Sequence, residues 1–202
     1  MSLQVTHLMI DIDGVVITGR PKDGASWKSG LQADLGIDPD DLRTGFFQPY
    51  WQKIVTGQLP LRATLERAKP DIAADALIEY WFRLDSRVNS DLLADIDHAR
   101  RSGLKVYFAT NQEHERAAYL WENLGLKNHA DGIIASAQVA AKKPDQAFFK
   151  AATKITNAAP ENHLLIDDTP ENITGAKAAN WQATHWDNQT RLPLILPKIL
   201  RG

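Results

Sequence analysis

The residues best suited to chemistry in this sequence are polar side chains that come just after short apolar segments. They are Asp11 and Asp13, Thr110 and Asn111, Lys143, and Asp167 with Asp168. Because open parallel sheets bind ligands at the carboxyl ends of their strands, we expect these side chains to gather at one edge. Crowded carboxylates repel one another unless a cation lies among them, and oxygen ligands without thiolates favour Mg²⁺. A lysine, a hydroxyl and main-chain N–H groups beside Mg²⁺ would form a phosphate site.

Each motif also has a purely structural interpretation. Two acids around one residue after a strand commonly form a turn, and Thr110 or Asn111 at a strand end commonly caps a helix. Lys143 would then be a solvated side chain. Asp167 and Asp168 would complement the dipole of the next helix. These interpretations do not explain why four motifs follow strands in this order, so the sequence favours one shared site.

Strand and helix patterns alternate along most of the chain. Strands are expected at 5–12, 104–109, 131–135, 163–166 and 181–185. Helices are expected from Asn89 or Ser90 to Gly103, at 113–124, at 145–157, after the N-cap Thr169, and near the C-terminus. This alternation predicts an α/β fold in which helices cover both faces of a parallel sheet.

Residues 19–88 depart from the alternation. They show helical patterns at 31–35, 42–55, 61–68 and 73–84, and no convincing strand. A parallel crossover needs only about a dozen residues, so this connection is an insertion. We therefore predict a core domain of residues 1–18 and 89–202, and a helical cap domain of residues 19–88 above the carboxyl edge of the sheet.

The composition excludes several classes of protein. The chain has 202 residues, 44% of them hydrophobic and 24% charged, which is typical of a globular protein. It has no cysteine, so disulfides, thiolate metal sites and a cysteine nucleophile are ruled out. The formal charge of −2 gives no net attraction to nucleic acid or to an anionic membrane. With no signal-peptide pattern and no membrane-length apolar run, we expect a cytoplasmic protein, and no obligate protein partner is evident.

Four motifs together resemble the haloacid dehalogenase-like hydrolase superfamily, in its phosphatase branch. They are MIDIDGVV at 9–16, VYFATN at 106–111, KKPDQAFF at 142–149 and LLIDDTPENITGAKAA at 164–179. The resemblance implies a three-layer, doubly wound, Rossmann-type sheet of strand order 5-4-1-2-3, with a C1-type helical cap. The sequence departs from the family at Ala140 and Ala141, where a glycine is common, at Ala130, where an aromatic is common, and at Asn180, which replaces a frequent glycine.

The resemblance also implies a role for each residue. Asp11 would be the nucleophile that forms an aspartyl-phosphate, and Asp13 the general acid and base. Thr110, Asn111 and Lys143 would bind the phosphate. Mg²⁺ would be held by a set of four residues: Asp11, Asp13 through its main-chain carbonyl, Asp167, which we favour as the acidic-pair ligand, and Asp168 as a second or outer one. The implied activity is Mg²⁺-dependent hydrolysis of a small phosphorylated metabolite.

Other functions stay open on this scaffold. A 2-haloacid dehalogenase would use the same nucleophile, although a halide leaves without needing the acid Asp13. A phosphomutase, or a non-catalytic phospho-acceptor or binding protein, would keep the same motifs. A receiver domain has a similar sheet but places its acidic pair first and has no such insertion. In the insertion, Phe46, Phe47, Tyr50 and Trp51 either line the cleft or, as for most such residues, pack inside the cap.

Overall fold

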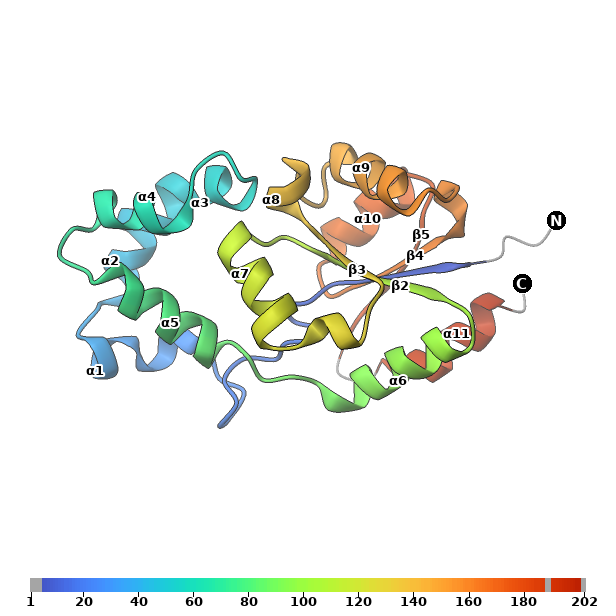
Figure 1. Cartoon of the computed structure of the whole chain (residues 1–202), viewed down its shortest axis with the longest axis horizontal. Coiled ribbons are helices and arrows are strands. Elements are labelled where there is room, and N and C mark those ends of the chain that lie inside the picture. The colour runs from blue at the N-terminus through green and yellow to red at the C-terminus, as the bar shows by residue number, and fades with distance from the viewer. Residues whose placement is uncertain (1–4, 188–189, 201–202) are drawn as a thin grey trace.

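A five-stranded parallel sheet lies at the centre of the computed structural model, which describes residues 5–187 and 190–200 (Figure 1). Its strands are β1 (His7–Ile10), β2 (Lys105–Thr110), β3 (Gly132–Ala135), β4 (His163–Asp167) and β5 (Gln182–His185). The order β3-β2-β1-β4-β5 confirms the expected arrangement. The first strand is shorter than predicted at both ends: it begins at His7, and a turn follows Asp11.

The register of the central strands brings the acidic motifs together. Ile10 in β1 pairs with Phe108 of β2 on one side and with Ile166 of β4 on the other. The main-chain N–H of Asp11 continues the ladder and donates to the carbonyl of Ile166 at 2.9 Å. Asp11 and Asp167 therefore leave neighbouring strands side by side at the carboxyl edge.

Helices cover both faces of the sheet, as predicted. They are α6 (Ser90–Arg101), α7 (His114–Ala118), α8 (Ser136–Val139), α9 (Gln146–Thr156), α10 (Pro170–Ala178) and α11 (Leu192–Leu200). In β1, Leu8 and Ile10 pack in a cluster with residues of α6 and α11. Met9, between them, packs on the other face with residues of α9 and α10. This alternation of side chains along a strand produces the three layers in Figure 1.

Several predicted helix ends are confirmed. The Asn89 side chain accepts a hydrogen bond from Leu92 N at 3.1 Å and so caps α6. Asn180 adopts φ of 62°, the left-handed conformation expected of it. Thr169 occupies the N-cap position of α10 but makes no side-chain cap bond. The helix predicted at 113–124 is α7 followed by a π-helical turn, η3 (Tyr119–Asn123).

The segment between β1 and α6 is helical, as predicted, and has its own hydrophobic cluster. Its helices are α1 (Leu31–Leu35), α2 (Pro39–Leu42), α3 (Gln48–Val55), α4 (Leu61–Ala68) and α5 (Ala74–Leu84), with a 3-10 turn, η1 (Trp27–Gly30), and a π-helical turn, η2 (Arg43–Phe47). The pattern at 42–55 is divided by η2, where Gln48 N bonds to Arg43 O, five residues back. Of the aromatic residues, Phe46 is buried in this cluster. The other three (Phe47, Tyr50 and Trp51) are half-buried against it, which favours packing.

Two chain segments that pair with each other join this helical part to the core. Ile17 and Val88 form an antiparallel bridge. Thr18 N donates to Arg87 O at 2.9 Å, and Asn89 N donates to Val16 O at 2.8 Å. The chain therefore enters and leaves the helical segment at nearly the same place.

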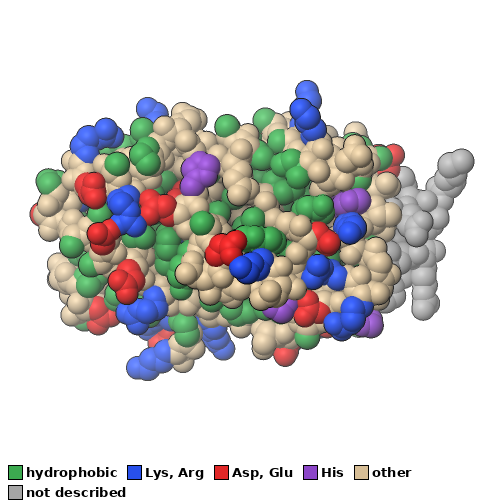
Figure 2. All heavy atoms as spheres, viewed as in Figure 1, with side chains coloured by type: hydrophobic (Ala, Val, Ile, Leu, Met, Phe, Trp, Pro, Cys, Tyr) green, Lys and Arg blue, Asp and Glu red, His purple; other side chains and the backbone are tan. Residues whose placement is uncertain are grey.

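On the face shown in Figure 2, acidic and basic side chains are interspersed among apolar ones. No single-sign basic patch gathers on that face among the described residues, which agrees with the nearly balanced composition. Within the described part of the chain, every helix is too short or too polar to traverse a bilayer.

We expect Ala140→Gly to stabilise the protein. Ala140 is exposed and ends α8 with φ of 54° and ψ of 25°, a left-handed conformation that costs a residue with a Cβ about 1–2 kcal/mol. Glycine removes that cost but loses about 0.5–1 kcal/mol of backbone entropy. Urea denaturation should therefore show a free energy of unfolding higher by about 0.5–1 kcal/mol. The buried neighbour Ala141 is not left-handed, so Ala141→Gly should destabilise, and equal destabilisation by both would contradict this reasoning.

Candidate active site

Three carboxylates meet at the carboxyl ends of β1 and β4. Asp11, Asp167 and Asp168 each place a carboxylate oxygen within 4.8 Å of the others. Asp11 and Asp167 are buried, and Asp168 is half-buried. The pKa of Asp11 is raised to about 7: burial is the largest cause, the charge of Lys143 opposes it, and the charges of Asp167 and Asp13 add to it. Burial, and then the charge of Asp167, also raise the pKa of Asp168.

Lys143 is the cation inside this cluster, and its side chain is buried. Its Nζ lies 2.5 Å from Asp167 Oδ2 and 3.0 Å from Asp11 Oδ1. Burial alone would lower the pKa of Lys143, but the two carboxylates outweigh that effect and the pKa lies above its usual value. The charged lysine thus links the ends of β1 and β4.

The two acids at the end of β4 have different surroundings. Asp167 accepts hydrogen bonds from Thr169 N at 2.9 Å and from Asn172 Nδ2 at 3.0 Å, in addition to the contact with Lys143. Both of its oxygens are engaged. Among the residues that the structure describes, the one side-chain bond that the Asp168 carboxylate accepts from another residue is a long bond, 3.3 Å, from the Thr169 hydroxyl to Oδ1. Its carboxylate therefore has more capacity to bind a further group.

Gly14 follows Asp13 and lets the main chain approach the carboxylate of Asp168 closely. Its φ is 82°, and a Cβ built on it would lie 2.0 Å from Asp168 Oδ2. A side chain at position 14 would clash with the acid as well as strain the backbone. The close contact between the turn after β1 and Asp168 thus explains why a glycine follows Asp13.

The residues at this edge fit a hard divalent cation. The side chains of the cluster supply three carboxylates, and Lys143 forms ion pairs with two of them. Oxygen ligands of this kind suit Mg²⁺. A cation there would favour the ionised form of the acids whose pKa burial raises.

Thr110 is the last residue of β2, and Asn111 directly follows it. Thr110 is buried at the strand end. Asn111 uses its amide to hold the main chain of Lys143. Its Oδ1 accepts from Lys143 N at 2.8 Å, and its Nδ2 donates to Lys143 O at 3.0 Å. Asn111 therefore positions the loop that carries the lysine.

Asp13 lies at the edge of the cluster with its side chain 51% exposed. Gln112 Nε2 donates to Asp13 Oδ2 at 2.6 Å, and Arg116 Nη2 lies 3.5 Å from Asp13 Oδ1. Sequence reasoning missed both residues, and also missed Asn172, which binds Asp167. Gln112 directly follows the predicted motif at 106–111, and this adjacency was the one signal that could have indicated it.

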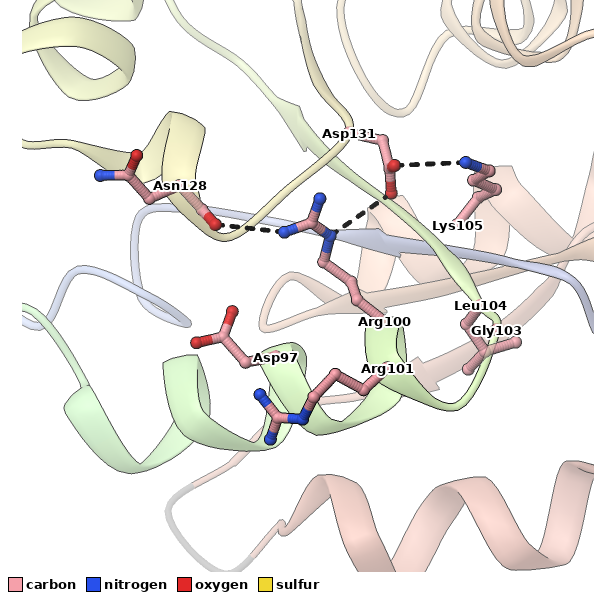
Figure 3. A pocket seen from close by; sticks show the side chains of 8 residues that line it. All are labelled: Asp97, Arg100, Arg101, Gly103, Leu104, Lys105, Asn128 and Asp131. Atoms are coloured by element: carbon pink, nitrogen blue, oxygen red, sulfur yellow. Dashed lines mark hydrogen bonds and ion pairs between the residues drawn. The ribbon is translucent and has the colours of Figure 1, made fainter.

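A separate hollow of about 520 Å³ lies far along the core from these residues, at the amino-terminal end of β2 (Figure 3). Three of its charged side chains form ion pairs: Arg100 and Lys105 both contact Asp131. Arg100 also donates to the carbonyl of Asn128 at 3.1 Å. The four polar motifs contribute nothing to this hollow, so it is no part of the candidate site.

Comparisons with known proteins agree with the fold described above. A family model for haloacid dehalogenase-like hydrolases matches residues 5–180. Among curated proteins, the chain is 23% identical over 184 residues to the plasmid phosphoglycolate phosphatase of Cupriavidus necator. This alignment covers 89% of this chain and 79% of that protein.

Two solved structures have a similar fold. One is a HAD family enzyme from Bacteroides thetaiotaomicron in complex with magnesium and inorganic phosphate, with a TM-score of 0.77, 15% identity, and coverage of 93% of this chain and 96% of the other. The second is the L-2-haloacid dehalogenase from Xanthobacter autotrophicus with chloropropionic acid covalently bound. It has a TM-score of 0.64, 14% identity, and coverage of 93% and 80%. At these identities, the structures establish the fold and leave the reaction to be argued from the site.

Proposed function

Because this chain belongs to the haloacid dehalogenase-like hydrolase family, we propose that it hydrolyses a small phosphomonoester through a phosphorylated Asp11. The observation that carries the proposal is the setting of the Asp11 carboxylate. Among the described residues, its hydrogen bond from Ile12 N at 2.8 Å and its contact with Lys143 at 3.0 Å both involve Oδ1. Oδ2 is then the oxygen that can attack phosphorus.

In the first step, Asp11 Oδ2 forms a bond to phosphorus while the bond from phosphorus to the leaving oxygen breaks. The electron pair of that bond goes to the leaving oxygen, which takes a proton from the Asp13 carboxyl group. Thr110 and Lys143 bind the phosphate oxygens that do not react. Bound Mg²⁺ would offset the charge between the two anions and stabilise the charge on the transferring phosphoryl group.

In the second step, a water oxygen attacks phosphorus and the bond to Asp11 breaks, which releases phosphate and restores the carboxylate. Asp13 takes the proton from the water and is ready to act as an acid again. We assign the acidic-pair metal ligand to Asp168, with Asp11 and the main-chain carbonyl of Asp13. Asp167 is then the buried partner that holds Lys143 in place, because its oxygens are already engaged.

A haloacid dehalogenase is the main alternative on this fold. It would also use Asp11, but a halide leaves as a stable anion and needs no proton. The short hydrogen bond from Gln112 to Asp13, 2.6 Å, supports the phosphatase, because only that reaction uses a positioned acid at this place.

We expect the purified protein to release phosphate from one or more small phosphomonoesters only with a divalent ion. The panel should include a nitrophenyl phosphate, and phosphoglycolate because the Cupriavidus relative is named for it. Chelation should lower turnover by about 10³-fold or more, and Mg²⁺ should restore it. Full turnover after exhaustive chelation would contradict the metal assignment. Consumption of a haloacid without any phosphate release would support the dehalogenase. Transfer of the phosphoryl group from one hydroxyl of a sugar phosphate to a different hydroxyl would indicate a phosphomutase.

A further inference from the structure

We propose that Gln112 and Arg116 are positioning residues that fix the carboxyl group of Asp13 and connect it to the helical segment above the sheet. This inference rests on the proposed function, in which Asp13 moves the proton. Proton transfer needs heavy atoms about 2.6–3.2 Å apart, so the rotamer of Asp13 has to be defined before the substrate reacts. Both residues lie in the segment that follows β2.

Gln112 makes the closer contact. Its side chain is buried, and its Nε2 donates to Asp13 Oδ2 at 2.6 Å. The main chain of Gln112 is itself held, since its carbonyl accepts from Ala137 N at 3.2 Å at the start of α8. A buried donor on a fixed backbone leaves the Asp13 carboxylate little freedom on that side.

Arg116 approaches the second oxygen of Asp13 and reaches the helical segment at the same time. Its Nη2 lies 3.5 Å from Asp13 Oδ1, 2.7 Å from the carbonyl of Asp85 and 3.2 Å from Asp85 Oδ2. Its guanidinium lies over the rings of Trp81 and Phe82, at 5.7 and 5.6 Å from their centroids. Asp85 directly follows α5, so a single nitrogen joins the last helix of the insertion to the proposed acid.

The burial of Arg116 is costly, which argues for a specific role. The side chain is fully buried, and its Nε and Nη1 are the only buried side-chain nitrogens or oxygens in the described residues without a hydrogen-bond partner. A buried donor that lacks a partner costs about 1–3 kcal/mol, and a buried charge costs more. A leucine or methionine would fill the space between Trp81 and Phe82 without that cost. What the arginine adds is the link between Asp13 and Asp85.

The Asp13 carboxyl group is held by donors on one side and is exposed on the other, where it can exchange a proton with the substrate. Its side chain is half exposed although both oxygens have a donor on the protein side. Because Asp85 belongs to the insertion and Gln112 to the core, Asp13 is fully positioned only when the two parts hold the relation seen here. Displacement of the insertion would take Asp85 away from Arg116 and so release the guanidinium that approaches Asp13, whereas the Gln112 contact lies wholly within the core.

Leaving-group dependence tests this proposal. An alkyl phosphate needs a proton on its leaving oxygen, whereas a nitrophenyl phosphate has an acidic leaving group and needs little help. The proteins to compare are the wild type, Asp13→Ala, Gln112→Met, Arg116→Lys and Arg62→Met. Arg116→Lys keeps the charge but cannot bridge Asp13 and Asp85 in the same geometry. Circular dichroism and thermal unfolding of each variant confirm that it is folded.

Arg62→Met is the matched control. Arg62 also joins the insertion to the core, with Nη2 at 2.9 Å from Glu115 Oε2, the residue next to Arg116. None of its contacts among the described residues involves Asp13. Its loss removes a link between the two parts and leaves the acid untouched.

We expect Gln112→Met and Arg116→Lys to lower kcat/KM on the alkyl phosphate by about 10- to 100-fold, with a loss on the nitrophenyl phosphate of about 3-fold or less. Asp13→Ala should show the same pattern more strongly, and Arg62→Met should change both substrates equally. Equal losses on the two substrates in both Gln112→Met and Arg116→Lys, or no loss, would overturn the positioning role. A wild type that hydrolyses no phosphomonoester would overturn the proposed function, and this inference with it.

Discussion

Asp11→Asn should lose at least about 10⁴-fold in turnover and form no covalent intermediate, because the amide is a far weaker nucleophile than the carboxylate. The carboxylate is buried and lies 3.0 Å from Lys143 Nζ, so the substitution also removes a negative charge that pairs with the lysine. The asparagine is nearly isosteric and keeps an oxygen for the bond from Ile12 N, so the fold should be retained.

Asp13→Ala should show the intermediate directly. Asp11 can still attack a substrate with a good leaving group, but no group then activates the water that hydrolyses the aspartyl-phosphate. General base assistance contributes about 10²–10⁴-fold, so the adduct should accumulate. After mixing with a nitrophenyl phosphate and acid quenching, mass spectrometry should find a species about 80 Da heavier that maps to Asp11.

The double variant Asp11→Asn with Asp13→Ala is the control for that adduct and should gain no mass. A phosphate on any other residue would contradict the choice of nucleophile. Full turnover by Asp13→Ala would remove its acid and base role. Wild-type protein with neither turnover nor adduct would indicate a non-catalytic scaffold.

Substitution of the two acids after β4 should have effects of different kinds. Asp168→Asn should raise the Mg²⁺ concentration for half-maximal activity by more than about 10-fold, because a carboxylate ligand of a hard cation is lost. Asp167→Asn should instead weaken folding, because it removes the anion 2.5 Å from a buried lysine. Breaking a buried pair in this way costs about 3–5 kcal/mol.

Calorimetric titration with Mg²⁺ and urea denaturation of both variants separate the two effects. The expected result is a large change in Mg²⁺ affinity for Asp168→Asn with near-normal stability, and a large loss of stability for Asp167→Asn. A folded Asp167→Asn protein that loses Mg²⁺ binding, together with an Asp168→Asn protein that binds normally, would return the ligand role to Asp167.

The strand ends that carry the site could be located from sequence because each is marked by an apolar run that stops at a polar residue. Asp11, Thr110 and Asp167 all follow this pattern, and the parallel order of the strands brings them to one edge. The resemblance supplied the strand order, which places β1 between β2 and β4. The different contacts of Asp167 and Asp168 could not be predicted from the sequence. Neighbouring residues at a strand end point in opposite directions, and only the packed structure shows which one meets Lys143.

The contacts around Asp13 had no local signal. Gln112 and Arg116 lie 99 and 103 positions away from Asp13 along the chain, and Arg116 is also held by Asp85 of the insertion. Composition would have placed Arg116 on the surface, because arginine is almost never fully buried unless paired. The places of the aromatic residues in the insertion could not be predicted either, because the lining of a cleft and a hydrophobic cluster use the same residue types. In the structure, Phe46 belongs to the cluster.

The pairing of Ile17 with Val88 has a consequence for the history of the protein. A segment whose two ends lie together closes a loop, and the entropy of closing a loop grows slowly, by about 0.6 kcal/mol for each doubling of its length. The free energy of unfolding of the core therefore changes little when such a segment is lengthened, shortened or exchanged at these two positions. The strand ends with Asp11, Thr110 and Asp167 all lie outside it. During evolution, the segment between positions 17 and 88 could therefore be exchanged for another, while the residues at the strand ends stay the same.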